Sequence, residues 1–258
     1  MRASIFVASF ALVLAATAPA FADDVATTST TSPTRAFAYV DDARIPQKNQ
    51  VIGVSTVTMT SGGDASRPFA ADLARPGGVL ESGAEVGLGK SLSVSMSGFH
   101  DGLYGLDSTS SGVSGALRFS PLTGGTRLVA SFGALRDLSG HAGVFSRASF
   151  AADLGALRLA GGFHAQHLFD PTRDALDVML TAGASVALPS ALRLGVEWVG
   201  QDLEGALDPL EKEGVRHFVG PTLGFAFGKN LSATAGPALG LSPGSPRTVG
   251  RFALVCSF

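Results

Sequence analysis

Charged residues that recur at alternate positions of apolar segments are the part of this sequence best suited to chemistry. Arg193 and Glu197 lie four residues apart, so on a strand both side chains would point to one face. A guanidinium group binds carboxylates and phosphates through paired hydrogen bonds. The residues expected to share an interior face are Glu81, Glu85, Arg118, Arg127, Arg147, Arg158, His164, Asp177, Arg193, Glu197 and Arg251. Two uses are open: the charges pair and brace a wall, or they line a narrow aqueous path and select solutes by charge.

Other motifs that could carry a reaction do not fit their surroundings. Residues 240–244 match G-x-S-x-G, but Pro243 predicts a hairpin loop instead of the strand-to-helix turn that this nucleophile motif requires. His164 and His167 are three residues apart, so on a strand they would point to opposite faces. We therefore expect no enzyme activity and no catalytic, cofactor or metal site. A hydrolase triad assembled from residues distant in sequence is the lowest-ranked alternative.

The composition excludes disorder and gives no reason to expect nucleic acid as a partner. Of 258 residues, 45% are hydrophobic and 16% are charged, against about 25% charged in usual soluble domains. Mean hydropathy is +0.30 and the formal net charge is −2. An acidic balance of this kind does not attract phosphate backbones.

The N-terminal 22 residues have the layout of a secretory signal peptide. Basic Arg2 precedes the apolar run 5–16, and small residues end the segment at Ala22. The run is shorter than the about 20 residues that a membrane helix needs. Residues 23–49 are then expected to form a flexible periplasmic leader. Within it, residues 36–40 fit either a short extra strand or a plug, and the sequence leaves both open.

The remainder, residues 50–258, divides into segments of about ten residues with alternating apolar and polar side chains, the length a tilted strand needs to cross a membrane. We count twelve: 50–60, 79–89, 91–100, 112–120, 127–136, 142–153, 156–167, 176–187, 191–200, 215–228, 230–241 and 246–258. Links after even-numbered segments are mostly tight, such as 153–155, whereas links after odd-numbered ones include long stretches such as 201–214. This predicts an all-β fold, a transmembrane antiparallel up-and-down β-barrel with both barrel ends of the chain on the short-turn, periplasmic side.

The alternation predicts a barrel that is apolar outside and polar inside. One expected outward set is Leu192, Leu194, Val196 and Trp198. Arg193 and Glu197 then face inward, because a charge facing lipid at mid-depth costs about 2–4 kcal/mol. A soluble barrel of the lipocalin type would be apolar inside and polar outside. In residues 50–60 two phases compete, one with Ile52 outward and one with Met59 outward.

The last segment carries a family resemblance. Gly250, Phe252, Leu254, Cys256 and Phe258 fall on one face, and the last residue is aromatic. This resembles the C-terminal recognition segment of bacterial outer-membrane β-barrel proteins. The resemblance implies a place in the bacterial outer membrane, contact with its lipid, and recognition by the barrel assembly machinery through Phe252, Leu254 and Phe258.

We expect this barrel to work as a narrow porin-like channel for small solutes, whose identity the sequence does not give. Twelve strands lie between barrels filled by side chains and the wide porins, which predicts a narrow bore. The alternative is a closed structural or surface-interaction barrel that acts through its extracellular loops.

Two prolines fit badly inside strands of a closed barrel. If the turn at 228–230 centres on Lys229, Pro221 and Pro237 lie opposite each other. Proline cannot donate a hydrogen bond to a neighbouring strand. We therefore predict a shared irregularity or bulge at this level.

Overall fold

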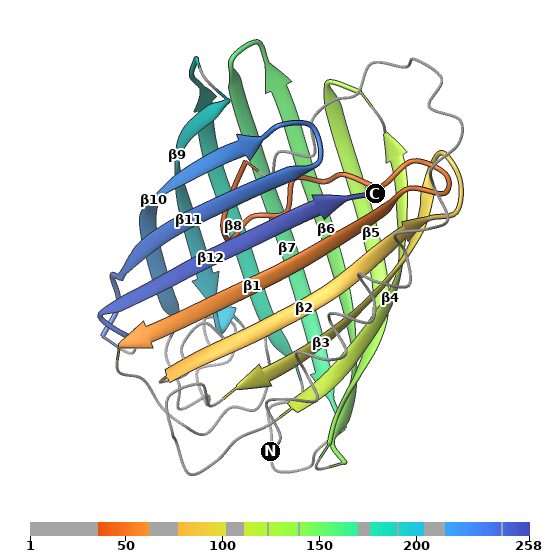
Figure 1. Ribbon diagram of the computed structural model, residues 1–258. Coiled ribbons are helices and arrows are strands. Elements are labelled where there is room, and N and C mark those ends of the chain that lie inside the picture. Colours follow the sequence, from red (N-terminus) through yellow and green to blue (C-terminus); the bar gives the residue numbers. More distant parts are fainter. Residues whose placement is uncertain are drawn as a thin grey trace.

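The protein is a closed barrel of twelve strands. The computed structural model describes residues 36–61, 77–101, 111–122, 124–138, 140–169, 176–189, 191–203, 215–243 and 245–258. The strands are β1 (Val51–Ser61), β2 (Gly77–Gly87), β3 (Leu92–Asp101), β4 (Ser111–Leu122), β5 (Thr126–Asp137), β6 (Ala142–Leu154), β7 (Leu157–Leu168), β8 (Asp177–Ala187), β9 (Leu192–Gln201), β10 (Arg216–Phe227), β11 (Leu231–Gly240) and β12 (Thr248–Ser257). Each pairs antiparallel with its sequence neighbours, and β12 pairs with β1 (Figure 1), which confirms the predicted fold. The predicted signal peptide, residues 1–22, lies outside the described residues.

The two ends of the barrel differ in their connections. Residues 155–156 and 228–230 are turns at what we call the short-turn end, where Gly155 and Gly228 adopt φ of 64° and 76°. These left-handed values favour glycine. The barrel closes at the same end, where the Val51 and Phe258 amides each donate to the other residue's carbonyl over 3.2 and 2.9 Å. The opposite end, where β1 ends at Ser61 and β9 ends at Gln201, is the long-loop end.

The outer surface of the barrel is apolar. Large exposed hydrophobic side chains on the strands include Met96, Val113, Leu117, Phe132, Leu159, Val196, Leu223 and Phe252. Arg136 is the charged residue that the strand alternation turns outward within the described strands, one residue before the end of β5. A soluble monomer rarely exposes so continuous an apolar surface, whereas hydrocarbon requires one around a closed sheet. No helix among the described residues is long and apolar enough to cross a membrane.

The structure decides the phase of β1 and tests the expected irregularity. Met59 is 46% exposed on the outer face, whereas Thr56 is buried in the lumen.

The β10–β11 ladder pairs Val219 with Leu239 and Leu223 with Ala235, but the intervening pairs, which would oppose the two prolines, are absent from it. The interruption is confirmed; the register is the same on both sides, so there is no bulge.

One segment before β1 lies inside the barrel. We call residues 36–48 the inner segment (orange in Figure 1). Phe37 and Val40 are fully buried, and near the short-turn end Lys48 forms a parallel bridge with Gly87. Residues 36–49 were predicted to belong to a flexible periplasmic leader, but residues 36–46 are largely buried within the barrel. The segment is not a barrel strand, so the plug is the alternative that the structure supports for residues 36–40.

Candidate functional site in the barrel lumen

The inner segment packs against an apolar part of the lumen wall made of small side chains. Its buried contacts fall into two clusters, one of Ala36, Phe37, Val40 and Ala43 with Val129, Ala151 and Ala160, and one of Ala38 and Tyr39 with Val199, Phe218, Ala238 and Val249. Gly183 makes room for this packing, because a Cβ there would lie 2.8 Å from the Phe37 ring and 3.3 Å from Val40. Packing of the apolar inner segment in the lumen therefore depends on a glycine in the wall, at which no side chain occupies the space.

Glu197 of β9 fixes the inner segment through its backbone. Its carboxylate is 3% exposed and accepts hydrogen bonds from the amides of Ala38, Tyr39 and Val40 over 2.7, 2.7 and 2.8 Å. Successive amides that converge in this way form a cradle for an anion. A buried carboxylate without partners would be strongly unfavourable, and so would three buried amides. Each side therefore satisfies the other.

Two carboxylates of the inner segment join the arginines of the wall. Asp41 lies 2.8 Å from the Arg118 guanidinium, and Asp42 lies 3.6 Å from that of Arg158. Arg158 and Arg127 also meet on Asp153, at 2.5 and 2.6 Å. Arg118 and Arg158 thus hold the inner segment through its carboxylates, and Arg127 and Arg158 are linked through Asp153.

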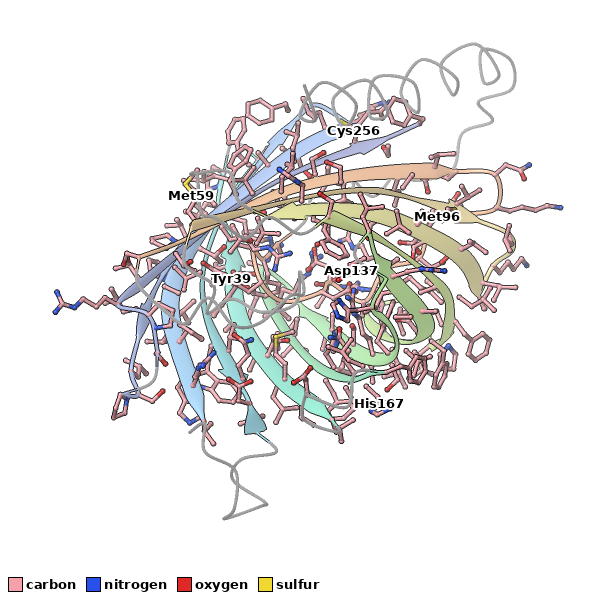
Figure 2. All side chains as sticks on the ribbon, turned by 90° about the horizontal axis from the view of Figure 1, so that it is seen from below. Tyr39, Met59, Met96, Asp137, His167 and Cys256 are labelled. Atoms are coloured by element: carbon pink, nitrogen blue, oxygen red, sulfur yellow. The ribbon has the colours of Figure 1, made fainter. Side chains whose placement is uncertain are left out.

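Tyr39 completes this attachment deeper in the lumen. Its hydroxyl donates to the carbonyl oxygen of Gly236 over 2.6 Å, and a Cβ at Gly236 would lie 3.2 Å from its ring. Burial raises the pKa of the Tyr39 hydroxyl above its ordinary value, so the group stays protonated and remains a donor. Figure 2, which views the barrel from below, shows Tyr39 inside the ring of strands and Cys256 on its outer side.

Beside the inner segment the lumen contains a cavity of about 330 Å³. Its lining combines Tyr39 and Asp41 of the inner segment with residues of the strand wall. The wall contributes the charged or polar residues Thr56, Glu81, Glu85, Ser95, Ser97, Ser114, Arg118, Ser131, Arg147, Ser149, His164, Gln166, Thr181 and Arg251. The inner segment therefore occupies part of the bore and leaves a polar space next to it.

Most charges around the cavity are paired. Glu85 accepts hydrogen bonds from Arg118 and, over 2.5 Å, from the Ser93 hydroxyl. Glu81 accepts from the Ser97 hydroxyl over 3.1 Å and lies 4.0 Å from the Arg251 guanidinium. These contacts hold carboxylates in place on one wall of the cavity.

Arg147 of β6 has different surroundings. Its Nε donates to Nδ1 of His164 over 2.9 Å, and its guanidinium lies 4.8 Å from the centre of the Phe145 ring. No carboxylate of the described residues lies within 4.0 Å of this guanidinium, and the side chain is exposed to the cavity.

The residues predicted for the interior face all belong to strands and point to the lumen side, but the structure separates them into groups. Those that line the cavity are Glu81, Glu85, Arg118, Arg147, His164 and Arg251. Arg127, Arg158 and Glu197 hold the inner segment. Arg193 donates to the Ser185 hydroxyl over 3.1 Å, and Asp177 lies beside Gln166 in the β7–β8 register.

Asp41 and Asp42 are site residues that the sequence analysis did not identify, and Tyr39 was included only as part of residues 36–40. The available signal is the apolar stretch 36–40 followed directly by two aspartates. Such a stretch has no use in a solvated leader. Within the described residues, no group of three or more His, Cys, Asp and Glu could hold a metal ion.

The architecture is that of porin-type barrels. The KdgM porin in complex with disordered oligogalacturonate superposes with a TM-score of 0.57 at 10% identity, over 80% of this chain and 99% of that chain. The COG4313 outer membrane channel from Pseudomonas putida F1 gives 0.53 at 9% identity, over 84% and 98%. No protein-family model and no curated protein matches the sequence. At these identities the likeness concerns the fold: this chain is built as outer-membrane channels are.

Proposed function

We propose that the protein is a porin-like channel of the bacterial outer membrane that conducts small polar solutes passively beside its inner segment. The observation that carries this proposal is the polar cavity of about 330 Å³ inside an apolar-surfaced barrel. Charged side chains such as Arg147 remain exposed to that cavity. A barrel that served only as a scaffold would have no need for solvated charges at its centre.

The outer-membrane location rests on two further observations. The exposed apolar surface of the strands requires lipid, and the sequence begins with a predicted signal peptide. The solved structures that it resembles are outer-membrane porins and channels, and we assign no catalytic activity.

Recording from purified protein in a planar lipid bilayer tests the channel proposal. We expect small, ohmic single-channel steps, because the inner segment narrows the bore. Absence of any conductance at either polarity, from protein shown to be folded by its heat-modifiable electrophoretic migration, would overturn it.

The second candidate function is a closed barrel that acts through its extracellular loops. The inner segment favours it, since Phe37, Val40 and their neighbours exclude water from part of the bore. Deleting residues 204–214 separates the two functions. A channel keeps its conductance after this deletion, whereas a surface-interaction barrel loses its partner and shows no conductance before or after.

We also propose that β12 carries the assembly signal. Phe252 and Phe258 are exposed on the outer face, and Leu254 is half-buried between them. Replacing Phe258 with Ala should lower the amount of folded barrel in the outer membrane, measured by heat-modifiable migration of membrane fractions. Replacement of Phe227, which is also exposed on the outer face at the short-turn end, is the matched control.

A further inference from the structure

We infer that the cavity contains a binding site for small organic anions, centred on Arg147. This inference names a solute class for the proposed channel and rests on that function. It starts from the difference between Arg147 and the carboxylate-paired arginines Arg118 and Arg158.

Arginines that brace the barrel are neutralised by carboxylates. Arg118 contacts Asp41 and Glu85, whereas Arg158 contacts Asp153. In such pairs the donors of the guanidinium are used by the protein itself, so these arginines have little to offer a solute.

Arg147 is positioned without a close ion pair: the carboxylates of Glu81 and Asp41 act on it only from beyond 4.0 Å. The hydrogen bond from its Nε to His164 and the Phe145 ring beneath it fix the plane of the guanidinium. Its two terminal nitrogens have no carboxylate of the described residues within 4.0 Å. A fixed guanidinium with free terminal N–H groups matches the two oxygens of a carboxylate.

His164 holds Arg147 in place and is itself buried. It is 6% exposed, and its ring interacts with the Gln166 side chain, although no hydrogen bond to Nε2 meets the usual geometry. Because Nδ1 accepts from Arg147, the proton of the neutral ring is assigned to Nε2. His164 therefore acts as the fixed acceptor for Arg147, and the guanidinium supplies the donors that a solute meets.

The other residues that line the cavity indicate which further chemical groups a bound solute would have. Hydroxyl groups line it, including those of Ser97 and Ser114, which lie 2.8 Å apart. Phe99 and Phe145 give it an apolar edge. Glu81 lines the cavity too and disfavours a second negative charge. The site therefore fits a singly charged carboxylate with hydroxyl groups.

A matched pair of probes tests the site in liposomes that contain the full-length mature protein. Gluconate and sorbitol have similar chains of hydroxylated carbons, but only gluconate has a carboxylate. We expect wild-type protein to admit gluconate in preference to sorbitol. Arg147→Gln should lower the gluconate-to-sorbitol influx ratio by about tenfold, the size expected when one charge-assisted interaction is lost. Arg147→Lys should keep part of the preference.

The matched control is Arg136→Gln, which removes the same charge from the outer face near the end of β5. An Arg147→Gln ratio equal to that of wild type, with both probes entering, would overturn the anion site and leave the channel function standing. If neither probe enters, the channel function fails. Calorimetric titration of gluconate into detergent-solubilised protein then decides the site. A binding heat that is measured with wild type and is absent with Arg147→Gln supports the site, whereas the absence of a binding heat with wild type overturns it.

Discussion

Two parts of the lumen wall differ in the side chains that they present. Where the inner segment fills the lumen, the wall presents apolar residues of β5–β7, such as Val129, and of β9–β12, such as Ala238 and Val249. Beside the inner segment the wall carries serines and charges such as Glu81 and Arg147, and a cavity remains. Glu197, a buried carboxylate where the inner segment packs, is paired with three amides of that segment. The contrast shows how a barrel with a fixed number of strands can control the width of its lumen. One part of the lumen is filled by the packed inner segment, and the other remains open as a cavity lined by charged side chains.

Deletion of residues 36–48 should have the largest effect on this contrast. It removes the material that fills one side, and water then reaches Glu197 and the apolar wall. We expect single-channel conductance to increase severalfold in planar bilayers, with a folded barrel retained because the strand ladder is complete without the segment.

A deletion of similar length within residues 24–35 is the control and should leave conductance unchanged. If the deletion of residues 36–48 left conductance at the wild-type level, the inner segment would not be what narrows the bore.

Glu197→Ala should release the inner segment without removing it. Three buried amides lose their acceptor, at a cost of about 1–3 kcal/mol for each. Conductance should move toward that of the deletion, with added open-channel noise as the segment leaves and returns.

Glu197→Gln is the matched variant. It keeps one carbonyl acceptor in the same place, so its conductance should lie between those of wild type and Glu197→Ala. Equal behaviour of Ala and wild type would show that the apolar contacts alone hold the segment.

Gly183→Ala should produce the smallest of these effects. The added methyl group lies 2.8 Å from the Phe37 ring, and overpacking of a buried site costs about 1–3 kcal/mol. We expect a modest rise in conductance and faster proteolysis within residues 36–48. Gly250→Ala, where a Cβ meets nothing within 4 Å, should match wild type in both measurements.

The sequence predicts the barrel well because every strand is constrained on two faces at once. Lipid outside and water inside force apolar and polar residues to alternate, and this period is visible in segments such as β9. The opposition of Pro221 and Pro237 was predictable for a related reason, since a tight turn fixes the register.

The candidate site is less predictable, because the groups that bind the inward-facing side chains do not belong to the alternating pattern of the strands. Glu197 is identified as an inward residue, but its three donors are backbone amides of residues 38–40, which no side-chain pattern marks. The difference between braced Arg118 and cavity-exposed Arg147 likewise depends on Asp41, which is distant in sequence. Pairing across a closed barrel is a three-dimensional property, so alternation alone does not reveal which charges remain available.

Thiol accessibility in liposomes tests the inverted arrangement of the two faces most directly. In a Cys256→Ser background, cysteines placed at Ser97 in the lumen and at Leu117 on the outer face are exposed to a membrane-impermeant, negatively charged methanethiosulfonate. We predict that the Ser97→Cys protein is labelled and that its current falls, while Leu117→Cys stays unlabelled within lipid. Labelling of Leu117→Cys with protection of Ser97→Cys would contradict a polar lumen inside a lipid-facing barrel.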